Sequence, residues 1–449
     1  MTAFLETRVG RLAVWVMGAA LLVLLGLAVG RLMPTQPLLG IGVALGVLGL
    51  GITAGEPAAI PLLSIPMLLV VARVGSGGLD LSVSDAVLFL ATLAALVFAH
   101  RPYSPPLRNL LWLAAVYQFA TLFTVIVNPY AANVIEWFHA WMLVAGASVV
   151  GWAIGRGGHA KLGLSLFLVT ALVLALLTIA HGVLQFAQGN FSPVYLTWPY
   201  GMHKNFVGTV LGFSAITAYV RPAWMGWSRR AALAAFWVMS VGLLFTQSRQ
   251  AILALGVVLV VVVLRGGGES IERGRSKAIL LAVLPAMVLV GTLVKDQVLE
   301  GSQFNSVFQR IAWFQETLAF WEDSPWVGHG LRYWSAGQGP GYQPPNAELE
   351  VLASAGVVGL VGFLILVVGA IIVLWRLDPV YGTLGVAVLL SRVVQSQLDL
   401  FWVAVQTSVP FVVAGICLGV EALAREERRL ASLASATRPA PLGAAPVTT

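Results

Sequence analysis

The sequence predicts an all-α, polytopic integral membrane protein with about 14 transmembrane helices (range 12–14) and one large extracytoplasmic loop that contains an amphipathic helix. Of the 449 residues, 59% are hydrophobic and only 10% are charged, whereas soluble domains carry roughly 25% charged residues. The apolar residues gather in runs of about 20, the length that crosses a bilayer as a helix. The single Cys417 lies inside such a run, which excludes a disulfide or cysteine–metal framework.

The predicted spans form one transmembrane domain over residues 1–424. The first run is longer than the core of a signal peptide and lacks a small-residue cleavage site, so we expect it to be retained. The runs are centred near 12–30, 38–54, 57–73, 85–99, 109–127, 133–154, 162–185, 205–220, 231–247, 250–264, 278–294, 350–375, 380–397 and 401–423. Residues 425–449 are basic and then Ala/Pro/Thr-rich, which predicts a cytoplasmic tail that ends in disorder.

The distribution of Lys and Arg predicts the orientation in the cytoplasmic membrane. With both termini in the cytoplasm, 18 of the 26 basic residues fall in cytoplasmic connections, as the positive-inside rule requires. The aromatic connection at 185–205 and the longest polar stretch, at about 296–348, then lie outside. Within the longer stretch, apolar residues recur at helical spacing and predict an amphipathic helix on the membrane surface: Ile311, Phe314, Leu318 and Trp321.

Three basic residues at the outer ends of the runs are candidates for binding an anion, because charges near membrane helices are costly and those retained there are functional candidates. Arg249 lies in a tight turn between two runs, and a guanidinium suits bidentate binding of phosphate oxygens. The alternative is an arginine that extends to lipid headgroups. Lys204 begins a helix whose N-terminus also attracts anions. Arg310 begins the amphipathic segment and either binds a sugar or pairs with the acidic residues that follow it.

Several other polar residues have both a structural and a functional interpretation. His203 is either a proton carrier or a hydrogen-bonding loop residue. Asn346 is a good N-cap for the run near 350–375, with Glu348 and Glu350 in its first turn; in the functional alternative, one of these carboxylates is a general base.

Two further sets of charged residues are expected to be structural. Arg392 and Asp399 flank the outer end of one run and predict an ion pair, and Asp85 is expected in the first turn or at the cap of its helix.

Three segments share the order and spacing of a known family. They are TQSRQAILAL (246–255), RIAWFQETLAFWEDSPWVGHGLRYW (310–334) and PPNAELEVLASAGVVGLVGF (344–363), with weaker support from GMHKNFVGTVLGF (201–213). Over roughly 200–420 the chain therefore resembles the O-antigen ligase and O-antigen polymerase family of membrane glycosyltransferases.

The resemblance implies a metal-independent, inverting transferase at the outer face of the cytoplasmic membrane. Its donor would be a glycan on a polyprenyl (undecaprenyl-type) pyrophosphate, and its acceptor a hydroxyl on a glycan or glycolipid. Arg249 would hold the pyrophosphate, and Lys204 and Arg310 would share its charge. The chain carries no Walker loop, dinucleotide fold or zinc motif, so no cofactor, metal ion or nucleic-acid partner is expected.

One position departs from the family pattern. Pro345 stands where the family commonly has the His that is favoured as the base, so the candidates for this role are Glu348, Glu350, His329 and His203. Ligase and polymerase are not distinguished by these residues. The alternatives to a transferase are a transporter of polysaccharide or lipid-linked glycan, and a catalytically inactive family member. Transporters hold substrate near the membrane midplane, whereas the unexplained charges here lie at the outer ends.

Overall fold

The structure, a computed structural model, describes most of the chain between residues 51 and 436. The described ranges are 51–53, 55–74, 81–198, 200–265, 306–334, 336–337 and 343–436, with a few isolated residues before position 50. The predicted runs at 12–30 and 278–294, most of the run at 38–54 and the last residues of the predicted tail, 437–449, lie outside them.

The regular secondary structure of the described part of the chain is helical apart from one isolated bridge, between Leu196 and Met202, and one antiparallel pair of two-residue strands, β1 (Arg73–Val74) and β2 (Leu81–Ser82). The helices are α4 (Ala59–Met67), α5 (Val83–Phe98), α6 (Pro105–Val127), α7 (Ala131–Trp141), the π-helix η1 (Met142–Gly146), α8 (Ala147–Arg156), α9 (Ala160–Ala187), α10 (Lys204–Val220), the 3-10 helix η2 (Ala223–Met225), α11 (Arg229–Thr246), α12 (Arg249–Arg265), α14 (Ser306–Asp323), α15 (Ala347–Trp375), α16 (Pro379–Gln395) and α17 (Ala404–Ala436).

Six of these helical segments are long and apolar enough to cross a membrane. They are Pro105–Val127, Ala131–Arg156, Ala160–Ala187, Arg229–Thr246, Ala347–Trp375 and Ala404–Ser435, and the apolar helices α5 and α16 are shorter. Every predicted run from 85–99 onward contains a helix, except the run at 278–294, which lies outside the described residues. The run at 57–73 is helical only as α4, which ends one residue after Pro66, a residue without an N–H to donate. The total of about 14 spans therefore remains a prediction.

Capping residues explain where several helices begin. Ser82 and Asp85 form a capping box at the start of α5, which confirms the predicted capping role of Asp85. Asp378 accepts a hydrogen bond from the backbone N of Val380 over 2.9 Å at the start of α16, directly before Pro379. Proline is favoured at this first position because its fixed φ matches the helix.

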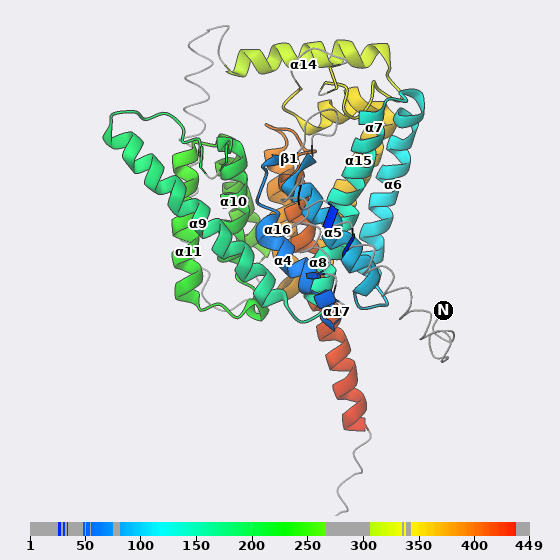
Figure 1. Cartoon of the computed structure of the whole chain (residues 1–449), viewed down its shortest axis with the longest axis vertical. Coiled ribbons are helices and arrows are strands. Elements are labelled where there is room, and N and C mark those ends of the chain that lie inside the picture. The colour runs from blue at the N-terminus through cyan, green and yellow to red at the C-terminus, as the bar shows by residue number, and fades with distance from the viewer. Residues whose placement is uncertain are drawn as a thin grey trace, which may run out of the picture.

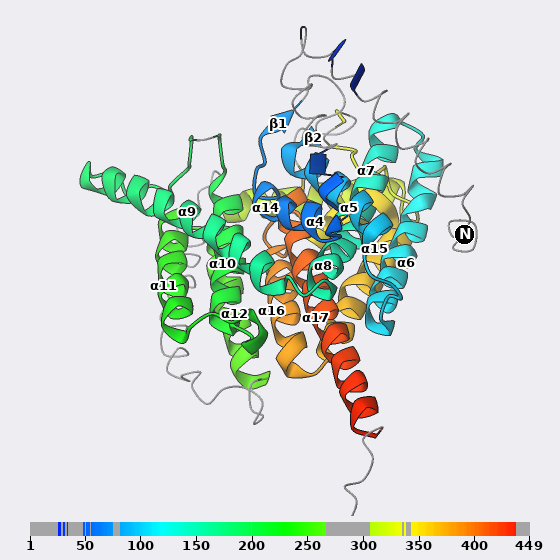
Figure 2. The same cartoon turned by 60° about the horizontal axis from the view of Figure 1, so that its bottom comes forward.

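The helices pack into a bundle with two distinct ends (Figures 1 and 2). Helix α14 lies across one end, and α17 projects from the other (Figure 1). Helix α17 packs against α8 and α16, α12 packs against α16, and α15 packs against α6. We call the two ends the α17 end and the α14 end. The α14 end includes the described residues of the connections at 128–130, 188–198, 200–203, 247–248, 324–334, 336–337, 343–346 and 396–403.

Helix α6 shows how the apolar sequence divides between the bundle and its outer surface. Trp112, Phe119 and Ile126 recur every seven residues, or about two helical turns, and between 64% and 72% of each residue is exposed. On the opposite face, Leu110 and Tyr117 are buried. A large apolar surface of this kind is typical of a helix that faces lipid.

Glycines let α8 and α17 approach each other at the backbone. A Cβ added to Gly151 would lie 2.0 Å from the carbonyl oxygen of Val412, and one added to Gly415 would lie 2.1 Å from that of Ser148. Small residues at an interface allow this approach in membrane proteins, where close packing replaces the hydrophobic effect between helices.

Helix α15 is interrupted at Gly356, whose backbone (φ 65°, ψ −168°) is not helical. Residues 324–330, which follow α14, insert at this break. In the first half of α15, the carbonyls of residues 353 and 354 accept hydrogen bonds from the backbone N of His329 and Gly330, over 3.1 and 2.8 Å. In the second half, the N–H groups of residues 357 and 358 donate to the carbonyls of residues 325 and 326, over 2.9 and 3.2 Å. We call residues 324–330 the wedge turn.

The glycines of the wedge turn and of α15 are required by this close contact. Gly328 has a φ of +68°, and a Cβ there would lie 2.4 Å from the backbone carbon of Ser354. A Cβ on Gly356 would lie 2.2 Å from the backbone carbon of Trp326. The predicted close packing of the Gly-rich segment is confirmed at Gly362, where a Cβ would lie 2.6 Å from that of Ala120.

Candidate functional site

The turn between α11 and α12 places Arg249 at the α14 end. Gln247 adopts a left-handed conformation (φ 50°), which reverses the chain after α11. The turn packs against Gly208 of α10, where a Cβ would lie 2.5 Å from that of Ser248. Because Gly208 has no side chain, the turn approaches α10 closely, about one helical turn beyond Lys204.

His203 caps α10 and presents a hydrogen-bond donor. Its Nδ1 accepts a hydrogen bond from the backbone N of Asn205 over 3.2 Å, so the neutral ring carries its proton on Nε2. Burial lowers the pKa of His203 and Lys204 lowers it further, while Asp399 opposes them. Of the two predicted roles, the structure supports the hydrogen-bonding residue, because the lone pair of Nδ1 is already occupied.

Three cationic side chains from distant parts of the sequence meet at the α14 end. The pKa of Lys204 is lowered mainly by burial and further by the charges of Arg249 and Arg310. The pKa of Arg310, on α14, is likewise lowered mainly by burial and further by Arg249. Coulomb effects of this kind weaken rapidly with distance, so the three side chains lie near one another. We call Lys204, Arg249 and Arg310, with His203, the cationic cluster.

Asp399 brings a negative charge to this cluster. Its Oδ2 accepts a hydrogen bond from Nε2 of Gln250 over 2.5 Å, and Gln250 directly follows Arg249. Asp399 also opposes the lowering of the pKa values of His203 and Arg310, which indicates that its carboxylate lies near both. Asp399 is not among the site residues that the sequence predicts, because the packing of α12 beside α16 is not apparent from the chain.

Arg392 and Asp399 do not form the predicted ion pair at salt-bridge distance, although the charge of Asp399 still acts on the Arg392 guanidinium. Arg392 is fully buried and donates to Oε1 of Gln406 and to the carbonyl of Phe401, each over 2.7 Å, and to the carbonyl of Leu400. In the described part of the chain, no carboxylate lies within salt-bridge distance of its guanidinium. Arg392 instead fixes the connection between α16 and α17, which carries Asp399.

The start of α15 contains the remaining acidic candidates. Asn346 accepts a hydrogen bond from the backbone N of Leu349 over 3.0 Å, which confirms the predicted N-cap. Glu350 is buried, and both of its oxygens accept hydrogen bonds: Oε1 from Nε2 of Gln343 over 2.7 Å, and Oε2 from the backbone N of Phe401 over 3.0 Å. These contacts favour a structural role for Glu350.

Glu348 differs from Glu350 in having one oxygen without a partner. Its Oε1 accepts a hydrogen bond from Nε2 of Gln397 over 2.8 Å, while Oε2 is buried and has no hydrogen-bond partner within the described ranges. Other buried side-chain atoms of the described ranges share this state, including two nitrogens of Arg265, so the open oxygen leaves Glu348 able to accept a proton without by itself assigning it a ligand. Gln397 lies two residues before Asp399, so Glu348 contacts the same connection that contributes to the cationic cluster.

His329 belongs to the wedge turn. Its Nε2 donates to the carbonyl of Phe320 over 2.6 Å, and its ring centroid lies 5.1 Å from that of Tyr333. These contacts hold the ring against the end of α14.

A buried ionic network that the sequence analysis missed joins α5, α7 and the segment after the wedge turn. His139 lies between two carboxylates, with Nε2 3.0 Å from Oδ1 of Asp85 and Nδ1 3.2 Å from Oε1 of Glu136. Nε of Arg332 donates to Oε2 of Glu136 over 2.6 Å. The spacing of Glu136 and His139, three residues apart, indicates that they share a helix face. Both lie inside the apolar run at 133–154, for which the sequence predicts only a membrane span.

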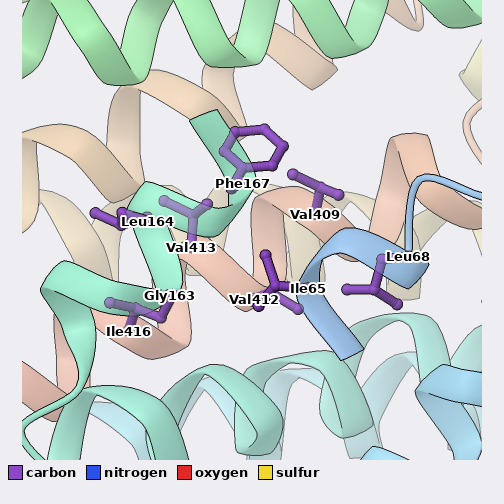
Figure 3. Close-up of a pocket in the computed structure, with 9 residues that line it drawn as sticks. All are labelled: Ile65, Leu68, Gly163, Leu164, Phe167, Val409, Val412, Val413 and Ile416. Carbon is purple, nitrogen blue, oxygen red and sulfur yellow. The ribbon is translucent and has the colours of Figure 1, made fainter. Parts of the chain in front are cut away.

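One small cavity lies among α4, α9 and α17 (Figure 3). Its volume is about 10 Å³, close to the minimum for one water molecule. It is lined only by apolar residues: Ile65, Leu68, Gly163, Leu164, Phe167, Val409, Val412, Val413 and Ile416. None of them belongs to the cationic cluster, so the cavity is a packing defect of the bundle. In the described part of the chain, no group of three or more His, Cys, Asp or Glu residues is arranged to hold a metal ion.

A protein-family model described as O-antigen ligase matches residues 234–364. The matched range includes Arg249, Arg310, the wedge turn and the start of α15. No curated protein matches the chain.

Proposed function

We propose that the chain, whose residues 234–364 match the O-antigen ligase family model, transfers a glycan from a polyprenyl (undecaprenyl-type) pyrophosphate donor to an acceptor hydroxyl on a glycan or glycolipid. Together, the family match and the apolar helices indicate a multi-pass membrane protein of polysaccharide biosynthesis. Proteins of this family act on lipid-linked glycans. The donor, the acceptor and the residues that bind them are our proposals.

The observation that carries the proposal is the convergence of Lys204, Arg249 and Arg310. Three like charges in a partly buried site destabilise one another, and a multiply charged anion would relieve this repulsion. A pyrophosphate gains negative charge as it leaves the sugar, and cations already held in position stabilise that charge strongly. The Nε2–H of His203 would add one hydrogen bond to the same oxygens.

We assign the role of general base to Glu348, since Pro345 occupies the position of the usual His. The acceptor oxygen would attack the anomeric carbon of the donor sugar as the bond from that carbon to the pyrophosphate oxygen breaks. Oε2 of Glu348 would take the hydroxyl proton, and the polyprenyl pyrophosphate would leave as the anion. A single displacement of this kind inverts the anomeric centre and requires no metal ion in the proposed scheme.

We further propose that the α14 end faces the outside of the cytoplasmic membrane. The connections at the α17 end carry many of the basic residues that the positive-inside rule assigns to the cytoplasm, including Arg101, Arg156 and Arg229. The cationic cluster lies at the opposite end of the same helices. A lipid-linked glycan on the outer leaflet would therefore present its pyrophosphate at the level of the cluster.

The proposal is tested with purified full-length protein, a polyprenyl-pyrophosphate glycan and candidate acceptors, without added metal or nucleotide. We expect glycan transfer by the wild type and a loss of about 100- to 1000-fold in Arg249→Ala, the effect of removing one group that stabilises developing charge. Growth of the same glycan would identify a polymerase, and attachment to a distinct lipid a ligase. Unchanged transfer by Arg249→Ala would contradict the proposed site.

If the folded wild type performs no transfer, an inactive family member is favoured. If it moves the lipid-linked glycan between leaflets of a vesicle without transfer, a transporter is favoured.

A further inference from the structure

We propose that the connection between α9 and α10, of which residues 188–198 and 200–203 are described, carries a saccharide-binding surface in which Tyr195 and Trp198 offer their rings to a sugar of the bound glycan. We call these residues the aromatic loop. The inference rests on the proposed function and adds to it a subsite for the glycan beside the subsite for the pyrophosphate.

The aromatic loop exposes large aromatic side chains although its backbone is held at several points. Trp198 is 70% exposed and Tyr195 is 45% exposed. Residues 194–196 alternate, because Val194 and Leu196 are buried on either side of Tyr195. Alternation of this kind points neighbouring side chains to opposite faces of an extended segment, so the buried pair anchors the loop and directs Tyr195 outward.

Hydrogen bonds tie the aromatic loop to the helices around it. The backbone N of Val194 donates to the carbonyl of Phe245 over 3.1 Å. The backbone N of Met202 donates to the carbonyl of Leu196 over 2.7 Å, within an isolated antiparallel bridge. These contacts mean that little conformational entropy is left to lose when a ligand binds.

The same loop is connected to two of the three segments that carry the cationic cluster. At one end, Nε2 of Gln247, two residues before Arg249, donates to the carbonyl of Phe191 over 2.8 Å. At the other end, the loop continues directly into His203, whose ring contacts that of Tyr195 edge to face, with centroids 5.4 Å apart. A pyrophosphate at the cluster would therefore place its first sugars close to Tyr195.

The chemistry of these side chains fits a sugar. One face of a sugar ring carries several C–H groups, and the negative face of an aromatic ring attracts them through its quadrupole. Tyr and Trp also supply one polar hydrogen-bonding group each. The alternative occupant is the membrane interface, where Tyr and Trp are also enriched. Phe191, at 68% exposure, has no polar group, and its ring lies against that of Phe186 on α9, with centroids 5.1 Å apart.

Because Phe191 is exposed but has no polar group, Phe191→Ala is the matched control for Tyr195→Ala and Trp198→Ala. All three variants are compared in a binding experiment on the intact protein in nanodiscs. The probes are soluble oligosaccharides released by mild acid from the lipid-linked glycans of the source cell, and inorganic pyrophosphate. We expect Trp198→Ala and Tyr195→Ala to weaken oligosaccharide binding about tenfold or more, the result of losing about 1.4 kcal/mol, and to leave pyrophosphate binding within about twofold. Phe191→Ala should change neither, and Trp198→Phe should keep most of the oligosaccharide affinity.

The outcomes separate this inference from the proposed function. If Arg249→Ala loses pyrophosphate binding but retains oligosaccharide binding, the two subsites are independent, as expected. If the wild type transfers glycan while Trp198→Ala shows unchanged oligosaccharide binding and unchanged KM, the inference is overturned and the function stands. If oligosaccharide binding depends on Tyr195 and Trp198 but no transfer occurs, the function is overturned and the subsite stands. Equal loss of membrane anchoring in Trp198→Ala and Phe191→Ala, without an effect on binding, would assign the loop to the interface.

Discussion

Helix α12 begins and ends with an arginine, and the two arginines have different surroundings. Arg265, at the α17 end, donates through Nη2 to the carbonyls of Trp375 and Leu377 over 2.8 and 3.2 Å, and its guanidinium lies 4.2 Å from the centroid of the Trp375 ring. Arg249, at the α14 end, lies near Lys204 and Arg310.

The comparison shows that burial and residue type alone do not distinguish a structural charge from a functional one. At the α17 end, cations meet carbonyls at helix C-termini, which stabilise a positive charge, or carboxylates such as Glu426, which pairs with Arg156. At the α14 end, Arg332 likewise pairs with Glu136, but in the cationic cluster three cations lie near one another, with Asp399 as the nearby carboxylate. Perturbed charges of this kind are typical of functional sites.

The largest expected effect separates the two arginines. Arg249→Ala should lower glycan transfer per folded molecule by about 100- to 1000-fold. Arg265→Ala should lower the free energy of unfolding by about 2 kcal/mol, because charged hydrogen bonds to the backbone are lost, while transfer per folded molecule stays near the wild-type value. Transfer assays and thermal unfolding in the same detergent measure both. A comparable loss of transfer in the two variants would remove the distinction.

The second effect compares the two acidic residues at the start of α15. Glu348→Gln removes the proposed base and keeps the side-chain shape, so transfer should fall about 100-fold or more without loss of folded protein. Glu350→Ala should instead lower stability by about 3 kcal/mol, because it leaves buried donors on Gln343 and Phe401 unpaired. Chromatographic profiles and transfer rates distinguish these results, and full activity in Glu348→Gln would exclude it as the base.

The third effect tests whether the wedge turn holds the α14 end in place. Gly356→Ala should lower stability by about 3 kcal/mol, because the new Cβ meets the backbone of Trp326 and the conformation suits only glycine. Gly337→Ala is the matched control, since its φ is +69° but no atom lies within 4 Å of the added Cβ. We expect a loss of only about 1 kcal/mol there. Equal melting temperatures for the two variants would contradict the close contact.

The smallest effect concerns pH. The pKa of Lys204 is lowered by burial, Arg249 and Arg310, and only the protonated ammonium attracts an anion. Pyrophosphate affinity should therefore fall as the pH rises through this lowered pKa, below the ordinary value of about 10.4. In Lys204→Arg the side chain keeps its positive charge at high pH, so the fall in pyrophosphate affinity should be severalfold smaller. Lys161→Arg, at the α17 end, should show the same dependence of pyrophosphate affinity on pH as the wild type. This control separates the titration of Lys204 from that of the pyrophosphate itself. Identical profiles for all three proteins would show that Lys204 does not contact the anion.

The sequence predicted Lys204 and Arg249 because each lies where an apolar run ends, and Arg310 because it begins the amphipathic segment. All three are among the eight basic residues that the topology rule leaves unexplained, and charge at such positions is informative without any knowledge of packing. The location of most helices followed from the same runs. The helix caps at Asp85 and Asn346 were predicted because their hydrogen bonds are local.

The missed features depend on contacts between distant segments. The partner of Asp399 is set by the packing of α12 against α16, so proximity in the chain pointed to Arg392 instead. The network around His139 joins three distant segments. Its two members within one apolar run, Glu136 and His139, were missed because hydropathy averaged over a window hides single charges. The break at Gly356 requires the wedge turn to complete its hydrogen bonds, and nothing within the Gly-rich segment itself distinguishes a break from close packing.

The interruption of α15 also limits how this protein is assembled. Four backbone groups beside Gly356 are satisfied by residues 324–330, and in hydrocarbon such groups cannot remain without partners. Helix α15 is therefore stable in lipid only together with the turn that precedes it, so the two must fold as one unit during biosynthesis. A protein divided between residues 337 and 343 and expressed as two pieces would reassemble only when the first piece retains that turn.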